Sequence, residues 1–497
     1  MGRWGIGVAL ILAAGVSAAK DAAKDAAGRT LEVWVSPAAV RLEASGVPEQ
    51  AASAARLSAV RGERESFFLV VRGDMEADEV EVAAPRLSGA QGSLPEGSVR
   101  VYRAGYVAVD GRRRVADALV PEGQPLPPGM APGRGENVAF FVEVAVPRRA
   151  QAGRYDGALR VRMNGWSMDV PVHLQIFDVE LPQVASLPSA FDFSAPDAAR
   201  AAGLAAVDPA GLEKLGRGHA LAALESRISL VAGSGAAPRY RLLPGEGALE
   251  LDFTDFDREL GPLLDGVPEL EGARASTVTL RMPRELGVMG RFKYALALRE
   301  HLVARGWGER LVDLAESSPL EAHQAEALAV RRVEARGWDE CLQAARARRP
   351  VWWRIPERDP EGSALGLGAE PVSIRAIGWL AWRAGAAGLR YGPARGFAPQ
   401  DGSWRSLFHA PGAMGTQGRP AVIESVRLKL LRDGLEDYEL LAQVAQAGQR
   451  ELADGLARKL ASSPRSYRKV PEAYDTAKVT LAQTLERLRA PAVQPAR

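Results

Sequence analysis

Cysteine and histidine are scarce in this sequence. The 497 residues contain one cysteine, Cys341, and five histidines. A single cysteine excludes an internal disulfide, so an exported form of the chain must take its stability from a large hydrophobic core. The histidines are dispersed and show no metal-ligand spacing, so the sequence predicts neither a metal site nor any other cofactor.

An excess of one charge is also missing. Lys and Arg number 63 against 61 Asp and Glu, which leaves a formal net charge of +2. Basic residues are scattered among acidic ones, without a long basic block, which argues against nucleic acid as a partner. The composition, 47% hydrophobic and 25% charged, is that of a globular protein. The length predicts two or three domains.

The N-terminus carries a short apolar run. Residues 6–16 are apolar, and Val16-Ser17-Ala18 supplies the small residues that a signal peptidase requires. The run is too short to span a bilayer. It predicts a cleavable signal peptide over residues 1–18, a secreted or periplasmic bacterial protein, and no membrane association after cleavage. An uncleaved membrane anchor is the alternative.

Residues 28–185 predict an antiparallel β-sandwich. Between Tyr155 and Pro182, apolar and polar residues alternate on both sides of Asn164-Gly165, which is typical of a long hairpin with a type I′ turn. Similar runs separated by turns precede this hairpin. In such a sandwich Glu63 and Glu65 would lie on the solvated face.

From residue 186 to residue 445 the pattern changes to alternating strands and helices. Examples are 276–282, 292–306 and 309–316. This order predicts an α/β domain that closes as a (β/α)8-like TIM barrel, although its first half is short for a full set of strands. Residues 446–490 show helical spacing and predict C-terminal helices.

The stretch "LLRDGLEDYELL", residues 430–441, concentrates four carboxylates in twelve residues. Apolar residues around it fall at helical spacing, while Asp433, Glu436 and Asp437 share a neighbouring face. Acidic residues on such a face are usually solvated or paired, here with Arg432. Gly434 costs about 1 kcal/mol relative to alanine inside a helix, which predicts a close packing contact or a helix start.

The same stretch, in the longer form "VRLKLLRDGLEDYELL", resembles the C-terminal signature of the glycoside hydrolase family 123 catalytic domain, also called domain of unknown function 4091. "RPVWWRIPE", "PVSIRAIGWLAWRAG" and "LELDFTDFDRELGPLLDG" resemble other parts of that domain, and "LSAVRGERESFFLVV" resembles its N-terminal β-sandwich module. The signature residues are Arg432, Asp433, Gly434, Glu436, Asp437, Tyr438 and Glu439.

The resemblance implies a barrel that acts on β-linked N-acetylhexosamines, particularly N-acetylgalactosamine, so an N-acetylhexosamine-containing glycan is the expected partner. The implied mechanism is substrate-assisted: a Glu protonates the leaving oxygen and an adjacent Asp orients the 2-acetamido group. In this sequence the position of that acid pair falls on Ser317-Ser318. Glu316, one residue earlier, and Asp313 are the remaining catalytic candidates.

Aromatic residues that would line the sugar site are Trp352, Trp353 and Tyr391, since aromatic faces stack on sugar rings; core packing is the competing interpretation. The chain departs from the family pattern beside them, with Arg354 after the paired tryptophans and Gly392 after the tyrosine.

Three hypotheses follow. In the first, the chain is a secreted family 123-like protein with lost or much reduced hydrolytic activity that still binds glycans. In the second, it is an active β-N-acetylhexosaminidase that uses Glu316, assisted by Asp313, Glu357 or Asp359. In the third, it is a secreted structural or interaction protein. We favour the first, because the acid pair is missing.

Overall fold

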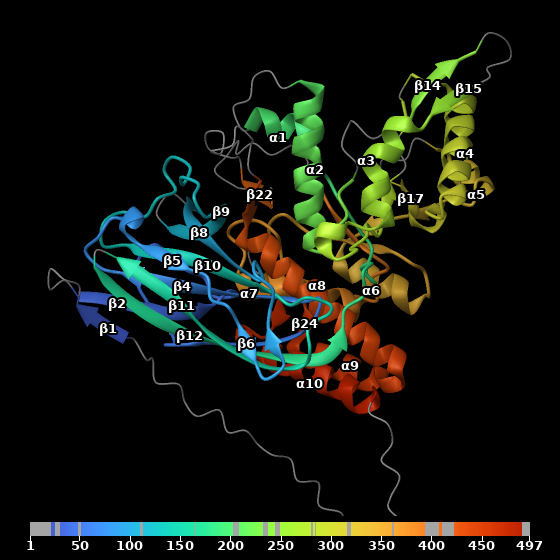
Figure 1. Cartoon of the computed structure of the whole chain (residues 1–497). Coiled ribbons are helices and arrows are strands. Elements are labelled where there is room, and N and C mark those ends of the chain that lie inside the picture. The colour runs from blue at the N-terminus through green and yellow to red at the C-terminus, as the bar shows by residue number, and fades with distance from the viewer. Residues whose placement is uncertain are drawn as a thin grey trace, which may run out of the picture.

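A computed structural model describes residues 21–24, 30–47, 51–109, 113–163, 165–201, 208–231, 237–243, 249–279, 282–283, 285–315, 320–359, 362–392, 407–409 and 422–489. Figure 1 shows sheets from the N-terminal part of the chain beside a region of helices and short strands. The predicted signal peptide, residues 1–18, lies outside the described residues.

Two sheets make up the N-terminal region. The first has the strand order β1-β2-β4-β10-β8-β9-β23-β22, and the second has the order β3-β12-β11-β6-β7 with β5 beside β11. The strands of the first are β1 (Asp21–Lys24), β2 (Thr30–Pro37), β4 (Arg64–Arg72), β8 (Val99–Ala108), β9 (Arg114–Pro121), β10 (Asn137–Ala145), β22 (Phe408–His409) and β23 (Ile423–Ser425). Those of the second are β3 (Ala55–Arg61), β5 (Glu81–Ala83), β6 (Ser88–Gly89), β7 (Gly92–Ser93), β11 (Gly153–Met163) and β12 (Trp166–Glu180). The strands of both sheets pair antiparallel except β3 and β12, which are parallel.

The predicted hairpin is confirmed. β11 and β12 pair antiparallel without a break from Gly153 opposite Ile176 to Met163 opposite Trp166. Gly165 has a φ of +79°, the left-handed conformation that a type I′ turn requires; Asn164 lies outside the described residues.

Alternation along β10 explains why this strand is buried on both sides. Phe140 and Val142 belong to a core that the two sheets share. Ala139 and Phe141 face the other way, into a second core that contains residues of the C-terminal helices. Because successive side chains of a strand point to opposite faces, the first sheet packs against the second sheet on one face and against helices on the other.

Parallel strands alternate with helices in the middle of the chain, as the sequence predicts. The strands are β13 (Ser189–Phe191), β16 (Val278–Thr279), β17 (Leu311–Leu314), β18 (Arg331–Val333), β19 (Ala335–Arg336), β20 (Trp352–Arg354) and β21 (Leu389–Tyr391). The helices are α1 (Ala195–Ala201), α2 (Pro209–Glu225), α3 (Thr254–Asp265), α4 (Val288–Ala304), α5 (Ala322–Ala327), α6 (Trp338–Arg346) and α7 (Pro371–Ala384). An antiparallel hairpin, β14 (Arg239–Leu242) and β15 (Leu249–Asp252), lies between α2 and α3 in the sequence.

These strands form two parallel sheets, with the orders β16-β17-β18 and β13-β21-β20-β19. Only Glu334 separates β18 from β19, so one sheet leads directly into the other. Phe191 of β13 also makes a parallel bridge to Leu230, and Ser229 is hydrogen-bonded to Ser276 just before β16. The parallel region is therefore continuous from β16 through β21 to β13.

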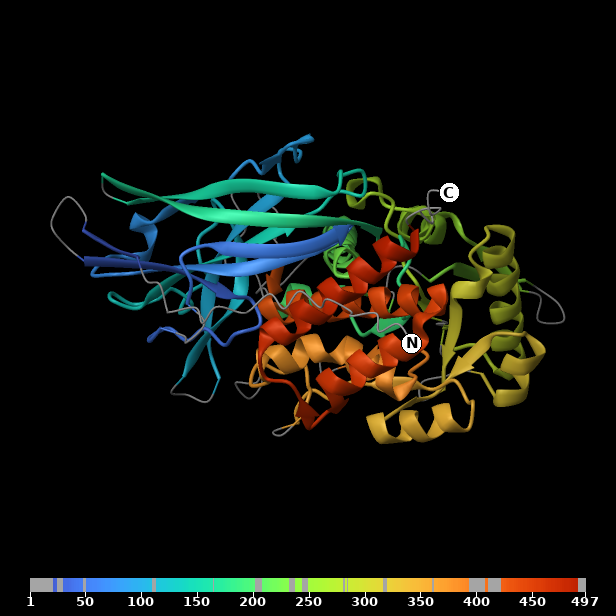
Figure 2. The ribbon, with the colours of Figure 1, turned by 90° about the horizontal axis from the view of Figure 1, so that it is seen from below.

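The C-terminal helices lie between the two regions. They are α8 (Val426–Val444), α9 (Arg450–Leu460) and α10 (Pro471–Arg489), with the short hairpin β24 (Ala461–Ser463) and β25 (Ser466–Tyr467) between the last two. A kink at Gly448, whose φ is +83°, separates α8 from α9. In Figure 2 they run between the blue sheets and the yellow parallel region. One hydrophobic core contains Trp34, Trp379 and Leu485 together, so the three regions pack as one body.

The segment just before α8 returns to the N-terminal sheet. Glu424 and Ser425 of β23 pair antiparallel with Leu119 and Ala118 of β9. No helix among the described residues has the length and hydropathy needed to cross a membrane.

Candidate functional site

The "LLRDGLEDYELL" stretch lies in α8, whose N-terminus is capped by Ser425: its hydroxyl accepts a hydrogen bond from the N–H of Leu428. Of the two expectations for the acidic face, solvent exposure is wrong and pairing with Arg432 is confirmed for Asp433 and Glu436. Glu436, Asp437 and Glu439 are only 2%, 0% and 1% exposed. Contacts with β4 and β9 on one side and with α7 and α10 on the others leave almost no part of the helix open to solvent.

The buried carboxylates of α8 are paired with cations from distant parts of the chain. Arg375 of α7 donates to both carboxylate oxygens of Asp437, at 2.9 and 3.3 Å, and Trp379 Nε1 donates to the same carboxylate at 2.9 Å. Arg227 donates to Glu439 at 2.9 Å. Hydrogen bonds between oppositely charged groups make such burial tolerable, because an unpaired buried charge is very costly.

The basic residues of α8 meet acidic residues of the first sheet. Arg432 and Lys429 both contact Glu143 of β10, and Lys429 Nζ also donates to Glu424 at 2.8 Å. Burial opposes ionisation of Glu143, but the charges of Lys429 and Arg432 outweigh it and hold the pKa of this carboxyl well below its usual range. Arg432 also donates to Asp433 at 2.8 Å.

Glu63 and Glu65 are paired in the same manner, so the expectation that they lie on a solvated face is wrong. Glu63 is 2% exposed and lies 3.3 Å from Lys478 Nζ of α10, which also contacts Glu65.

A further buried group joins β9 to the start of α8. Asp117 accepts hydrogen bonds from Arg427, with the shortest at 2.9 Å, and from His409 Nε2 at 2.7 Å. Burial again opposes ionisation, but Arg427 and His409 outweigh it, so the pKa of Asp117 is lowered. The charged residues around α8 thus connect the N-terminal sheet, α7 and α10 through hydrogen bonds to α8.

Gly434 marks a close helix crossing, as its position in the sequence predicts. A Cβ atom at Gly434 would lie 3.0 Å from the carbonyl carbon of Arg375 and closer still to its oxygen. A Cβ atom at Gly378 would lie 2.5 Å from the carbonyl carbon of Gly434. The backbones of α7 and α8 approach to a distance that only glycine permits.

Of the two catalytic candidates, Glu316 lies outside the described residues, together with Ser317 and Ser318. Asp313 lies in β17 and is fully buried, with Arg332 Nε 3.9 Å from its carboxylate. Leu311 packs in the core that contains α4, whereas Val312 and Leu314 pack with strand residues in a different core. Alternation therefore places Asp313 on the helix-covered face of the strand.

The three aromatic candidates are buried. Trp352 and Trp353 are each 1% exposed, and Tyr391 is 3% exposed. Trp352 packs in the core between the parallel strands, whereas Trp353 and Tyr391 pack in the core with the C-terminal helices. The structure brings Trp353 and Tyr391 into one core and leaves Trp352 in another, and all three rings serve as packing residues here. Their contact with a sugar stays a prediction.

The carboxyl ends of β13, β20 and β21 carry charged residues that the sequence analysis did not single out. Arg390 donates to both oxygens of Asp192 at 2.8 Å. Arg354 is the register neighbour of Arg390 on the adjacent parallel strand, which places the two side chains on one face. Asp192 and Arg390 are therefore joined as a hydrogen-bonded ion pair at the ends of these strands.

A groove of ≈560 Å³ runs between α2 and α3 beside the strand ends. Arg258 of α3 contacts Glu213 of α2 at 3.3 Å and Asp255 at 3.0 Å. Partial burial, and the nearby charge of Glu213, raise the pKa of Glu259 in the same groove. A concave surface with several convergent polar groups is the usual form of a small-molecule site.

Comparison with solved structures identifies the fold. A family 123 glycoside hydrolase from Clostridium perfringens, studied for glycolipid glycan hydrolysis, superposes with a TM-score of 0.61 over 92% of this chain and 98% of its own, at 11% identity. The chain has the fold of a family 123 glycoside hydrolase. A β-glucuronidase from Parabacteroides merdae reaches a TM-score of only 0.24 at 10% identity, over 75% of this chain and 52% of its own. No family model and no curated protein sequence matches the chain.

Within this family 123 fold, the described residues include no group of three or more His, Cys, Asp or Glu side chains arranged to hold a metal ion. Asp192 and Arg390 are the strand-end residues that sequence reasoning missed. Asp192 directly follows β13, but its partner lies 198 positions away, so no local pattern identifies the pair.

Proposed function

We propose that the chain is a secreted, glycan-binding relative of the family 123 hydrolases whose hydrolytic activity is lost or much reduced. The observation that carries the proposal is Ser317-Ser318 at the position of the acid pair. A serine hydroxyl does not replace a carboxylic acid as a proton donor near neutral pH, and loss of such a donor typically removes roughly 10²–10⁴-fold of the rate.

We further propose that the two parallel sheets close as a barrel of the (β/α)8 type, and that the N-terminal sheets form its β-sandwich module. The two parallel sheets, separated along the chain only by Glu334 between β18 and β19, support the first part. The core shared by the two N-terminal sheets supports the second. In such barrels ligands bind at the carboxyl ends of the strands. The groove between α2 and α3, beside Thr279, Phe193 and Leu230, is then the place for a β-linked N-acetylhexosamine.

Hydrolysis of chromogenic β-N-acetylgalactosaminide and β-N-acetylglucosaminide by the chain without residues 1–18 tests the loss of activity. We expect no turnover, or turnover lowered by several orders of magnitude relative to an active family member. Turnover that disappears in Glu316→Gln would instead establish the alternative, an active hexosaminidase with a displaced acid.

Calorimetric titration with an N-acetylgalactosamine-containing oligosaccharide tests the binding. Arg258→Gln, in the groove, should weaken binding at least tenfold. Arg160→Gln is a matched control, since Arg160 is 53% exposed against 56% for Arg258 and lies in the β11–β12 hairpin. Folded protein that neither binds nor hydrolyses would favour the third hypothesis, a structural or interaction protein.

A further inference from the structure

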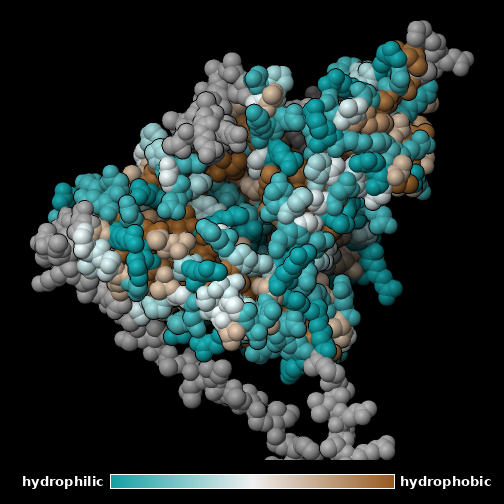
Figure 3. All heavy atoms as spheres, viewed as in Figure 1, coloured by the Kyte–Doolittle hydropathy of each residue, from teal (hydrophilic) through white to brown (hydrophobic). Residues whose placement is uncertain are grey.

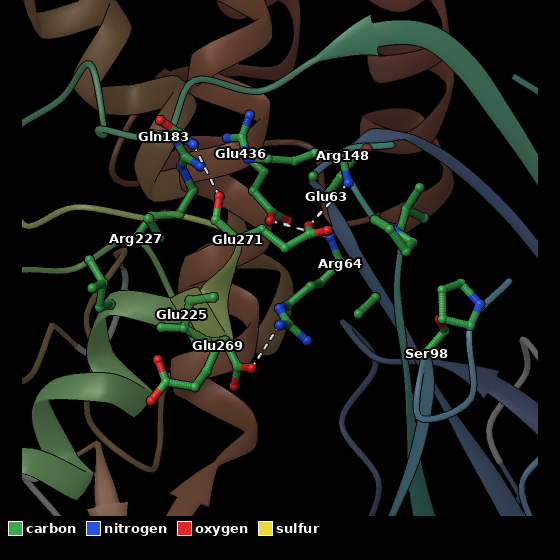
Figure 4. Close-up of a pocket in the computed structure, with 18 of the residues that line it drawn as sticks. Glu63, Arg64, Ser98, Arg148, Gln183, Glu225, Arg227, Glu269, Glu271 and Glu436 are labelled. Atoms are coloured by element: carbon green, nitrogen blue, oxygen red, sulfur yellow. Dashed lines mark hydrogen bonds and ion pairs between the residues drawn. The ribbon is translucent and has the colours of Figure 1, made fainter. Parts of the chain in front are cut away.

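A second pocket lies at the opposite end of the parallel strands. Its volume is ≈270 Å³. It is bounded by segments that precede strands, around Gln183, Arg227 and Ala273, by the β3–β4 turn at Glu63 and Arg64, and by α8. Figure 4 shows these side chains around the pocket. Ligands of parallel barrels bind at the carboxyl ends of the strands, so this pocket is separate from the groove described above.

Acidic side chains outnumber basic ones on the pocket wall. Six glutamates line it against three arginines, Arg64, Arg148 and Arg227. The six are Glu63, Glu96, Glu225, Glu269, Glu271 and Glu436.

Each of the three arginines already holds a carboxylate. Arg64 contacts Glu143 and Glu225, Arg148 contacts Glu180, and Arg227 contacts Glu439. Three of these partners, Glu143, Glu180 and Glu439, do not line the pocket. Glu63 and Glu225 likewise have cationic partners outside the wall, in Lys478 and in Arg100 and Lys429, so the negative excess rests on the remaining glutamates.

Glu436 has hydrogen-bonding capacity that the described residues do not use. It is 2% exposed and lines the pocket, and one oxygen accepts from the backbone N–H of Arg64 at 3.3 Å. The other oxygen, Oε2, is buried and receives no hydrogen bond from the described residues; its nearest cation, Arg432 Nε, is 3.8 Å away. A buried acceptor without a donor costs roughly 1–3 kcal/mol, more when charged. A ligand donor would remove that cost.

Glu271 presents a second carboxylate from the opposite wall. Its backbone adopts a left-handed conformation, with a φ of +53°, and its carbonyl accepts from Gln183 at 3.0 Å. One carboxylate oxygen accepts from the N–H of Arg148 at 3.0 Å. In Figure 4 the side chains of Glu271 and Glu436 extend into the same part of the pocket.

We propose that this pocket binds a small solute through a primary ammonium group, which donates to Glu436 Oε2 and to the carboxylate of Glu271. An ammonium group has three donors and no acceptor, which suits a wall rich in carboxylates. The negative excess favours a cation over a neutral hydroxyl compound of the same size.

Protonation of Glu436 gives the binding a measurable signature. Burial, and the nearby charges of Glu63 and Asp433, raise the pKa of Glu436 well above its usual range, against the opposing charges of Arg432 and Arg227. A carboxyl with a raised pKa keeps its proton to a higher pH than an ordinary glutamate. An ammonium ligand stabilises the ionised carboxylate, so binding releases a proton and becomes tighter as the pH rises.

Putrescine is the probe, and butane-1,4-diol is its neutral isostere. Titration calorimetry of the full chain in two buffers of different ionisation enthalpy should show saturable binding of putrescine, a released proton, and no binding of the diol. Glu436→Gln should weaken binding at least tenfold and abolish proton release. Glu271→Gln, at an exposed residue, should also weaken binding at least tenfold. Glu81→Gln, at an exposed residue of β5 that does not line the pocket, should change binding less than twofold.

Three results would overturn the proposal: no saturable binding of putrescine to the folded wild type, equal affinity for the diol, or unchanged affinity in both Glu436→Gln and Glu271→Gln. If circular dichroism shows that Glu436→Gln does not fold, Glu271→Gln alone decides the outcome.

Discussion

Replacing Gly434 with alanine tests the close crossing of α7 and α8. The new methyl group would lie 3.0 Å from the carbonyl carbon and 3.3 Å from the Cα of Arg375, and closer still to the carbonyl oxygen. All three obstructing atoms belong to the backbone of α7. They cannot rotate away as a side chain does, so the helices must separate.

Two effects of opposite sign determine how much Gly434→Ala changes the free energy of unfolding. Alanine is favoured over glycine inside a helix by about 1 kcal/mol. Overpacking costs roughly 1–3 kcal/mol, and we take about 3 kcal/mol because the obstruction is backbone and because separation also stretches the Arg375–Asp437 hydrogen bonds. The expected net effect is a loss of about 2 kcal/mol in the free energy of unfolding.

Denaturant unfolding followed by circular dichroism measures this change. Gly455→Ala in α9 is the matched control, since a Cβ atom there meets nothing within 4 Å. It should raise the free energy of unfolding by about 0.5–1 kcal/mol, the ordinary gain from replacing a helical glycine. If Gly434→Ala were stabilising to the same degree as Gly455→Ala, the close crossing would not exist as described.

Two further substitutions test the buried charges and the pH dependence. Asp437→Asn leaves Arg375 without its buried partner and should cost about 3–5 kcal/mol in unfolding free energy. Asp475→Asn, at a carboxylate that is 47% exposed, should cost less than about 1 kcal/mol. Similar losses in the two variants would refute a difference between the buried and the exposed ion pair. Burial lowers the pKa of His219 to about 4, below its usual value of about 6.5, so folding loses stability as the pH falls from 6.5 to 4. Relative to wild type, His219→Phe should therefore gain up to about 3 kcal/mol between pH 7 and pH 4, and a pH-independent difference between the two would contradict this.

Local patterns in the sequence predicted the parts of the fold that depend on neighbouring residues. The β11–β12 hairpin follows from two-residue alternation and a turn at Gly165, and the parallel strands follow from their alternation with helices. The return of β23 to pair with β9 was not predicted. That pairing joins Glu424 to Leu119 across more than half of the chain, and no local pattern carries such information.

The environment of α8 could not be derived from local patterns for the same reason. Charged residues at helical spacing normally indicate a solvated face, and only their partners show otherwise. Arg427 lies 310 positions from Asp117, and Arg375 lies 62 positions from Asp437. Gly434 was the exception, because an unfavourable residue inside a helix indicates a contact even when the partner is unknown.

The two catalytic candidates, Asp313 and Glu316, lie in β17 and just after it in the sequence. Asp313 is buried because it lies on the helix-covered face of β17 with Leu311. The aromatic candidates illustrate a different difficulty. Tryptophan is typical both of sugar sites and of cores, and Trp352 and Trp353 are 1% exposed here.

The stretch that resembles the family 123 signature has a structural role in α8. Its charged residues bind partners in β9, β10 and α7, and Gly434 permits the helix crossing, so packing and charge pairing account for these features without any chemistry at a sugar. A protein that no longer hydrolyses glycans would need them as much as one that does. The stretch therefore indicates the fold, and we propose that the residues at positions 316–318 decide the activity.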